Sequence, residues 1–240
     1  MLQALVFDVD GTLADTEEAH RAAFNQAFAE AGCGWVWDLE IYGKLLEVSG
    51  GKERILHYWK QVQPELIPFY GNSVQESVDR LHALKTLAYE QAVRDGAVSL
   101  RPGVLALIEA ARNAGLQLAI ATTTTPANID ALLKANIGPH WHQLFAVVED
   151  AATAPLKKPH PQVYSQAIQR LQLPATACLV FEDSLNGLQS ATAAGLPTVI
   201  TPTDYTRNQN FQNALRVLPN LAGVTLTQLR SWHETAAATA

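Results

Sequence analysis

The chain has 240 residues, of which 48% are hydrophobic and 17% are charged, and this composition excludes intrinsic disorder, a collagen repeat and a disulfide scaffold. Its 17 basic and 23 acidic residues give a net charge of −6, which argues against sequence-independent binding to nucleic acid or to an anionic membrane. The cysteines, Cys33 and Cys178, belong to no metal-binding pattern, and no apolar run reaches the length of a membrane span. We therefore expect a cytoplasmic, monomeric enzyme.

Short apolar segments predict buried parallel strands, because strands that are covered on both faces need not alternate between polar and apolar residues. These segments are residues 4–8, 117–121, 144–148, 178–182 and 198–200. Beyond residue 100 they alternate with amphipathic helices, expected over residues 102–114, 126–136 and 161–171. This order predicts an α/β fold with a doubly wound, Rossmann-like parallel sheet.

The segment between about residues 15 and 96 carries helical patterns and no convincing strand. Asp15 and Glu18 resemble a capping box before a helix that ends at Gly32, and further helices are expected over residues 38–48 and 73–94. We expect residues 1–15 and 96–240 to form the core and residues 16–95 an inserted all-helical cap, with a ligand cleft between them. The Ala-rich end, residues 236–240, is expected to fray.

Two aspartates follow the first predicted strand. Asp8 and Asp10 are two residues apart, so in an extended chain both project to one side, while Val9 turns back toward the core and Gly11 permits a tight exit. An isolated pair of this kind is usually a turn cap with a solvated neighbour. Its place at the carboxyl end of a buried strand, where open α/β sheets bind ligands, favours a functional site.

A second acidic pair, Glu182 and Asp183, ends the fourth predicted strand. Carboxylates about 4 Å apart repel one another by about 4 kcal/mol at an effective dielectric near ~20, unless a cation lies between them. Oxygen ligands without His or Cys favour Mg²⁺. The pair therefore predicts a magnesium site, and the alternative is a helix N-cap with an acidic first turn.

Two further residues are candidates for binding phosphate. Thr122 directly follows the second predicted strand and offers a hydroxyl and a backbone N–H, while Lys158 offers a positive charge. Taken singly, a threonine there is usually a turn residue and a lysine before proline is usually solvated. Their order at successive strand ends of one sheet favours a role in binding phosphate for both residues.

The motifs Asp8-Val9-Asp10-Gly11-Thr12-Leu13, Thr122, Lys158-Pro159 and Glu182-Asp183 together resemble those of the haloacid dehalogenase superfamily of phosphohydrolases. The likeness covers essentially the whole chain, and the insert resembles the cap of the beta-phosphoglucomutase-like branch. It implies Asp8 as nucleophile, Asp10 as general acid and base, and Thr122 and Lys158 as phosphate anchors. It also implies Mg²⁺ bound by Asp8, Glu182, Asp183 and the carbonyl of Asp10. We expect the pKa of Asp10 to be raised in the closed complex by nearby negative charge.

The cap sequence points to a second anion. Gly50 and Gly51 directly precede a predicted helix, and Lys44, Lys52 and Arg54 add positive charge, although a glycine hinge with solvated basic residues would look similar.

The run over residues 37–54 resembles the CbbY family, found in bacteria with Calvin-cycle genes and in chloroplasts. Its known members dephosphorylate xylulose-1,5-bisphosphate, an inhibitor of Rubisco, to xylulose 5-phosphate. The resemblance implies a small sugar phosphate as substrate. The substrate contacts that it implies are Glu17, His20, Lys44, Gly50, Gly51, Lys52 and Arg54, and we expect Arg101 and Thr123 to be further substrate contacts. His20 could equally be an interhelical core residue, and Arg101 an anchor of the hinge.

Other functions remain open at this point. A sugar phosphomutase shares the core chemistry, but mutases of this branch typically place an Arg soon after Val-Ser, where this chain has Gly50 and Gly51. A receiver-like signalling domain also phosphorylates an Asp, but its acidic pair precedes that Asp in the chain. A non-catalytic phosphosugar-binding protein would not need every ionisable motif residue.

Overall fold

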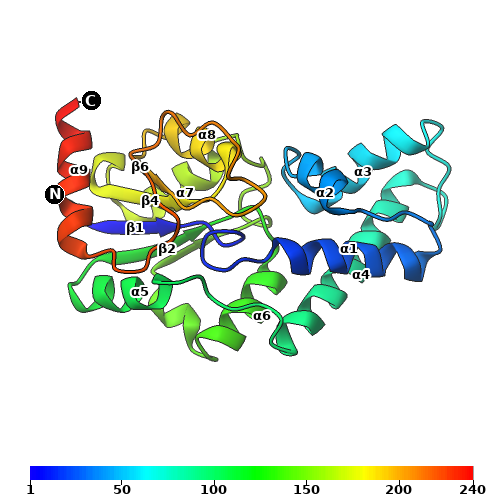
Figure 1. Ribbon diagram of the computed structural model, residues 1–240, viewed down its shortest axis with the longest axis horizontal. Helices are drawn as coiled ribbons and strands as arrows, with labels where there is room; N and C mark the ends of the chain where they lie inside the picture. The colour runs from blue at the N-terminus through cyan, green and yellow to red at the C-terminus, as the bar shows by residue number, and fades with distance from the viewer. Residues whose placement is uncertain (240) are drawn as a thin grey trace.

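The computed structural model describes residues 1–239 (Figure 1). Within them, parallel strands form one sheet in the order β3-β2-β1-β4-β5-β6. The strands are β1 (Ala4–Phe7), β2 (Gln117–Ala121), β3 (Val147–Glu149), β4 (Cys178–Glu182), β5 (Thr198–Ile200) and β6 (Arg216–Val217). The first strand lies between β2 and β4, so the chain winds outward from β1 in both directions. This is the doubly wound α/β topology, and the predicted fold class is confirmed.

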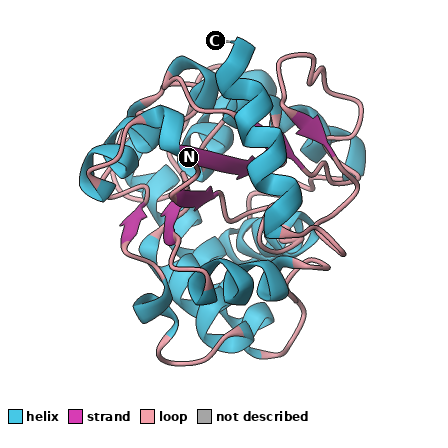
Figure 2. Ribbon diagram, turned by 90° about the vertical axis from the view of Figure 1, so that its left-hand side faces the viewer, coloured by secondary structure: helices cyan, strands magenta, loops and turns pink. Residues whose placement is uncertain are grey.

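Helices cover both faces of this sheet, and a separate group of helices lies beyond the carboxyl ends of the strands (Figure 1). The sheet is flanked by α5 (Val104–Asn113), α6 (Pro126–Asn136), α7 (Gln162–Leu171), α8 (Leu185–Ala193) and α9 (Leu226–Thr239), with short 3-10 helices η1 (Trp141–Leu144) and η2 (Ala175–Ala177). The separate group is α1 (Glu17–Ala31), α2 (Leu39–Leu45), α3 (Gly51–Val62) and α4 (Val74–Arg94). We call this group the cap. Figure 2 looks from the side of α9, where the N-terminus also lies, opposite the cap.

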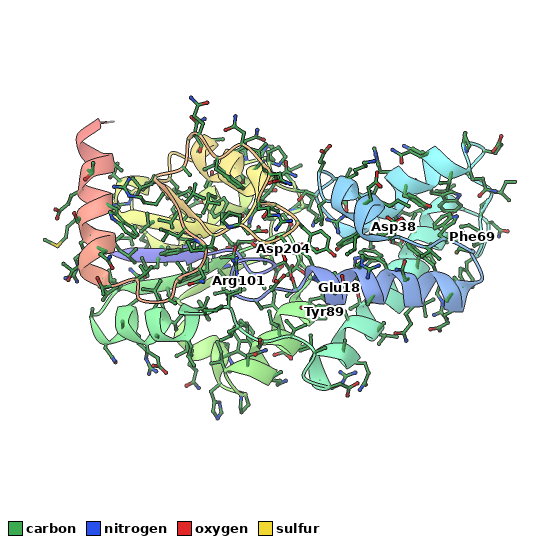
Figure 3. All side chains as sticks on the ribbon, in the orientation of Figure 1. Glu18, Asp38, Phe69, Tyr89, Arg101 and Asp204 are labelled. Atoms are coloured by element: carbon green, nitrogen blue, oxygen red, sulfur yellow. The ribbon has the colours of Figure 1, made fainter. Side chains whose placement is uncertain are left out.

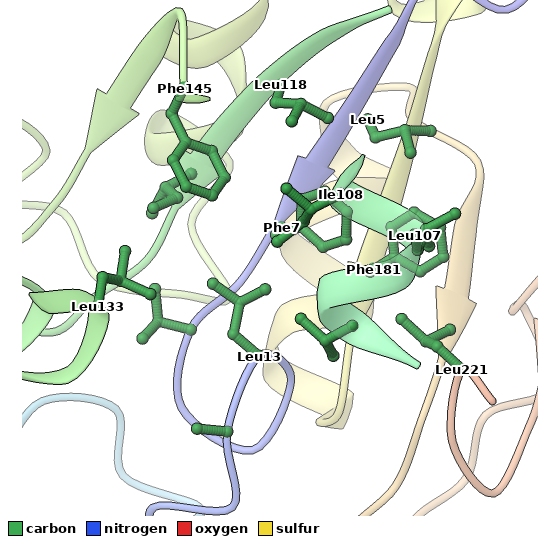
Figure 4. Packing of buried hydrophobic residues seen from close by; sticks show 14 of the residues in the cluster. Leu5, Phe7, Leu13, Leu107, Ile108, Leu118, Leu133, Phe145, Phe181 and Leu221 are labelled. Carbon is green, nitrogen blue, oxygen red and sulfur yellow. The ribbon is translucent and has the colours of Figure 1, made fainter. Parts of the chain in front are cut away.

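Alternation along β1 explains why the sheet is covered on both faces. Leu5 and Phe7 pack into one hydrophobic cluster with α5 and α6, while Ala4 and Val6 pack into another with α7. The rings of Phe7 and Phe181, on adjacent strands, stack with centroids 4.9 Å apart (Figure 4). Every residue of β1 is fully buried, so the strand end is held firmly and the residues that follow it are fixed in position.

The cap has a hydrophobic cluster of its own, built around aromatic rings. Phe24 and Phe28, one turn apart on α1, both pack against Trp37, with centroids 4.6 and 4.8 Å away. The helix ends as predicted at Gly32, whose φ of 69° is the left-handed conformation that terminates helices. The predicted capping box is wrong: the N-cap is Thr16, without a side-chain cap bond, and Asp15 is exposed.

Other elements differ from the prediction at the edges of the sheet. The strand expected over residues 144–148 begins only at Val147, because Trp141 to Leu144 form η1. The edge strand β6 escapes prediction because both of its residues are exposed and carry no apolar pattern. The tail expected to fray from residue 236 is helical through Thr239, and its last residue, 240, lies outside the described residues.

Among residues 1–239, every helix is too short or too polar to cross a membrane. Cys33 and Cys178 are free thiols.

Gly103 and Gly96 provide a matched test of backbone packing. Both have positive φ, 87° and 80°, but a Cβ on Gly103 would lie 2.1 Å from the Leu221 carbonyl, whereas nothing lies within 4 Å at Gly96. Gly96→Ala should lower the free energy of unfolding by about 1–2 kcal/mol through the left-handed conformation alone. Gly103→Ala should cost about 1–3 kcal/mol more, because the backbone must move. Urea denaturation measures both, and equal losses would contradict the argument.

Candidate active site

The strand ends bring three motifs together. Phe7 is in register with Phe181 on β4, and Asp8 N–H donates to the Phe181 carbonyl at 3.0 Å, so Asp8 and Glu182 are neighbours. On the other side, Thr122 follows β2 and its N–H donates to the Glu149 carbonyl at 3.0 Å. Asp8, Thr122 and Glu182 are all buried and all line one cavity between the sheet and the cap.

Gly11 allows this convergence. Val9 is buried in the core, and its carbonyl accepts bonds from the N–H groups of Thr12 and Leu13, which closes a tight turn after β1. A Cβ on Gly11, whose φ is 78°, would lie 2.3 Å from Asp183 Oδ2. The turn can therefore approach Asp183 only because residue 11 has no side chain.

Lys158 connects the two acidic motifs. Its Nζ donates to Asp8 Oδ1 at 2.6 Å, to Glu182 Oε1 at 2.5 Å and to the Ala121 carbonyl at 3.0 Å. Tyr164 also donates to Glu182 Oε1, at 2.6 Å. Burial would lower the pKa of Lys158, but Asp8 and Glu182 outweigh it and hold this pKa above its usual value. The structure thus places a permanent positive charge beside Asp8.

Asp8, Glu182 and Asp183 form an acidic group whose ligand atoms lie within 4.8 Å of one another. Burial, opposed by Lys158 and assisted by Glu182, raises the pKa of Asp8 to about 7. Burial and the charges of Glu182 and Asp8 raise the pKa of Asp183 well above its usual value.

The donor set suits a hard divalent cation such as Mg²⁺. All of the donors are oxygens, and the Asp183 carboxylate accepts no hydrogen bond from the described residues. The oxygens of Glu182, in contrast, are occupied by Lys158, Tyr164 and its own loop.

Asp10 points away from this acidic group and toward the cap. Its Oδ1 accepts bonds from Thr16 Oγ1 at 2.8 Å and from His20 Nε2 at 2.9 Å. Lys85 Nζ lies 2.8 Å from the other ring nitrogen of His20, and a charged lysine can only donate there. His20 is therefore neutral, with its proton on Nε2, and burial together with Lys85 lowers its pKa.

The groups around Asp10 determine its protonation state in this structure, and the raised pKa expected in the closed complex stays a prediction. Burial would raise the pKa of Asp10, but its interactions with His20, Thr16 and Lys85 outweigh burial and hold the pKa of this carboxyl below its usual range. Asp10 is therefore an acceptor here, and its side chain is not among the three carboxylates that could hold a metal.

The structure brings most of the predicted substrate contacts to the cavity. Those that line it are Glu17, His20, Gly50, Gly51, Arg54 and Thr123. His20 is also buried against Tyr89, with ring centroids 4.1 Å apart, so its core role and its place in the cavity coexist.

Lys44, Lys52 and Arg101 do not line this cavity. Lys44 is exposed and pairs with Glu40 one turn earlier on α2 at 2.7 Å, and Lys52 points outward to Asp79 at 2.5 Å. Arg101 donates to backbone carbonyls, including those of Gly11 and Thr201. It therefore anchors the segment where the chain returns from the cap to the core, near residue 96, which we call a chain crossing together with the segment near residue 15. Figure 3 shows Arg101 beside the sheet, with Glu18 and Tyr89 at the ends of α1 and α4 that face it.

Two cavity residues on α4, His82 and Lys85, escaped prediction. Lys85 is 4% exposed, and its Nζ lies 5.0 Å from the centroid of Phe24 and 5.1 Å from that of Tyr89. The sequence did contain a pattern that could have identified Lys85. Leu81, Lys85 and Tyr89 are spaced by four residues, so they share one face of the helix, and the lysine interrupts the apolar side chains of that buried face.

Two hydrogen bonds join the cap to the core away from the chain crossings. Asn186 Nδ2 donates to the Glu47 carbonyl at 3.0 Å, and Tyr205 OH donates to Glu18 Oε2 at 2.9 Å. Both are exposed, and Asn186 also lines the cavity.

Comparisons with known proteins agree with this geometry. The sequence model of the haloacid dehalogenase-like hydrolases matches residues 2–195, and the chain belongs to this family. Within the family it belongs with the CbbY proteins. It is 51% identical to plasmid-encoded CbbY of Cupriavidus necator, covering 97% of both chains, and 47% identical to CbbY of Rhodobacter capsulatus, covering 92% of this chain and 94% of that protein. The chain is accordingly a phosphatase.

A solved structure supports the same assignment. The crystal structure of Rhodobacter sphaeroides CbbY in complex with phosphate has a TM-score of 0.88 and 40% identity, covering 96% of this chain and all of that one. A beta-phosphoglucomutase from Clostridium difficile, at a TM-score of 0.80 but 20% identity, shares the fold.

The buried Lys85 predicts a measurable pH dependence of stability. Burial, only partly offset by Asp10, lowers the pKa of Lys85 from 10.5 to about 8. Between these values the unfolded chain binds more protons than the folded one, so the free energy of unfolding should rise with pH, by up to about 3 kcal/mol.

Urea denaturation at several pH values should show this rise in wild type relative to Lys85→Met. The exposed Lys60→Met serves as control and should follow wild type. A difference between wild type and Lys85→Met that stays constant from pH 8 to 10.5 would show that Lys85 does not titrate in this window.

Proposed function

We propose that this phosphatase is Mg²⁺-dependent and hydrolyses the C1 phosphate of xylulose-1,5-bisphosphate, giving xylulose 5-phosphate. The observation that carries the proposal is the cavity itself, which has Asp8, Thr122 and Lys158 on the core wall and Arg54, His82 and Lys85 on the cap wall. A crystal structure of a mutant Rhodobacter sphaeroides CbbY in complex with xylulose-(1,5)bisphosphate supports it, with 40% identity to this chain and a TM-score of 0.87.

In the first half-reaction, the free Asp8 Oδ2 attacks phosphorus and the bond from phosphorus to the C1 oxygen breaks. Asp8 Oδ1 is held by Lys158, so one oxygen is fixed and the other is available. Lys158 and Thr122 stabilise the charge that spreads over the phosphoryl oxygens. Asp10 gives its proton to the departing sugar oxygen.

In the second half-reaction, Asp10 takes a proton from the water that attacks the aspartyl-phosphate, and free phosphate and Asp8 result. Asp10 takes up the proton for the first step from solvent when substrate binds, and after the second half-reaction it holds the proton that came from water. The negative charge of a bound phosphate opposes His20, Thr16 and Lys85 and so raises the pKa of Asp10.

Asp8 and Asp183 would hold Mg²⁺, with Glu182 beside them and the carbonyl of Asp10 as a further ligand. When bound, the ion supplies positive charge that balances the carboxylates and the transferring phosphoryl oxygens.

The second phosphate of the substrate would lie against the cap. Gly50 is the N-cap of α3 and Gly51 its first residue, the first N–H groups of the helix have no helical partner, and Arg54 and His82 line the same wall. We also propose that residues 16–95 act as the substrate-selecting domain on a core of residues 1–15 and 96–240.

Phosphate release from a panel of pentose and hexose mono- and bisphosphates tests the function. Wild type should release phosphate fastest from xylulose-1,5-bisphosphate, and Asp8→Asn should abolish release because an amide cannot accept the phosphoryl group. The exposed Asp15→Asn, from the same loop, is the matched control and should keep activity.

Isomerisation of glucose 1-phosphate by the same enzyme would favour a mutase. An acyl phosphate that persists for minutes would favour a receiver-like domain. Either result, or a faster reaction with another sugar phosphate, would contradict the proposal.

The metal site is testable without turnover. A cation bound at about 100 times its dissociation constant stabilises the folded state by about 2.7 kcal/mol, which is on the order of 5–10 °C in Tm for a chain of this size. Excess Mg²⁺ should raise the Tm of wild type by this amount and that of Asp183→Asn by much less. Asp130→Asn, an exposed carboxylate on α6, should respond like wild type. Equal shifts for both variants would contradict the assigned ligands.

A further inference from the structure

Glu17, at the start of α1, lines the cavity and has one carboxylate oxygen that accepts no hydrogen bond from the described residues. The residue lines the cavity wall and is 9% exposed. Its Oε2 accepts a hydrogen bond of 2.7 Å from Tyr42 OH, while Oε1 accepts none from the described residues. A carboxylate accepts hydrogen bonds and repels phosphate, so the free oxygen fits a hydroxyl group.

Tyr42, on α2, fixes the direction of this carboxylate. Its side chain is fully buried, and its hydroxyl receives a hydrogen bond of 3.3 Å from Arg54 while it donates to Glu17. Burial and the charge of Glu17 raise the pKa of Tyr42 well above its usual value, so the hydroxyl keeps its proton. The three groups form a chain in which each hydrogen bond has one possible direction.

Neighbouring side chains pack against the Tyr42 ring and restrict its position. Arg54 lies over it, with Cζ 5.3 Å from the centroid, and Arg54 is itself held by bonds to the carbonyls of Leu45 and Val48. The rings of Trp37 and Tyr205 pack around it, with centroids 6.0 and 5.7 Å away. Tyr205 belongs to the core, so the cap and the core together hold the hydroxyl in place.

We propose that Tyr42 is a positioning residue that holds Glu17 as the acceptor for a sugar hydroxyl, and that this pair makes the phosphatase select polyhydroxylated esters. The inference rests on the proposed function, because it needs a substrate with hydroxyl groups near the scissile phosphate. Tyr42 acts through Glu17 and does not touch the reacting atoms.

The test compares Tyr42→Phe with wild type on two substrates. Without Tyr42 OH, Glu17 is released and its bond to the sugar hydroxyl is lost. A hydrogen bond to a charged group is worth about a factor of ten or more in affinity, so KM for xylulose-1,5-bisphosphate should rise at least about tenfold while kcat changes less than about threefold. For p-nitrophenyl phosphate, which has no sugar hydroxyl, the rise in KM should be at least about fivefold smaller. Tyr58→Phe is the matched control, since Tyr58 lies in the same aromatic cluster and its hydroxyl forms no hydrogen bond with the described residues.

A double-mutant cycle separates positioning from a general loss of structure. In a Glu17→Gln background, Tyr42→Phe should add less than about a twofold further rise in KM, because the two residues act as one unit. Multiplying effects, or an equal rise in KM for both substrates with a lowered Tm, would overturn the proposal.

The result also separates this inference from the proposed function. If wild type does not hydrolyse xylulose-1,5-bisphosphate, the function fails, and the comparison is made with the sugar phosphate that it hydrolyses fastest. A KM for that sugar that Tyr42→Phe leaves unchanged would overturn the role of Tyr42.

Discussion

Lys158 lies between Asp8 and Glu182 in a space that is almost closed to water, and this arrangement of buried charges determines the chemistry of the site. Each charge removed from water costs several kcal/mol, and the carboxylates also repel one another. A single ammonium group contacts two of the three carboxylates, so the group keeps an excess of negative charge. Asp183 has no partner of this kind, and burial together with the charges of Glu182 and Asp8 raises its pKa. A group with this excess of negative charge suits a divalent cation, and the cation and Lys158 together would suit a phosphoryl group.

The sheet makes this arrangement possible because its interior is rigid. Neighbouring strands in register carry Asp8 and Glu182 to the same level, and the stacked rings of Phe7 and Phe181 lie one residue before them. Movement of either strand end would lengthen the contacts that Lys158 makes with Asp8 and Glu182, which are 2.6 and 2.5 Å long. The packing of the core therefore fixes the distances between the charged groups in the cavity.

The core of the site could be predicted from the sequence because each motif directly follows a buried strand. Asp8, Thr122 and Glu182 needed only the rule that parallel strands end at one edge. The cap was harder, because the reach of a long side chain depends on how helices pack. Lys52 and Arg54 are two residues apart and adjacent to the same glycines, yet one points outward to Asp79 and the other lines the cavity.

Lys85 and Tyr42 are cavity-related residues that sequence-based prediction missed, also because helix packing decides where their side chains lie. Each comes from a helix distant in sequence from its partner, and neither belongs to a motif around a strand end. Their roles follow from contacts with His20 and Glu17, which the helical patterns alone could not specify.

The bonds from Asn186 to Glu47 and from Tyr205 to Glu18 have a consequence for the reaction cycle. Both are solvent-exposed, and such bonds contribute about 1 kcal/mol each. Because they are this weak, losing them leaves the cap joined to the core through the bonds that Thr16 and His20 make with Asp10, the residue that moves protons in the proposed reaction.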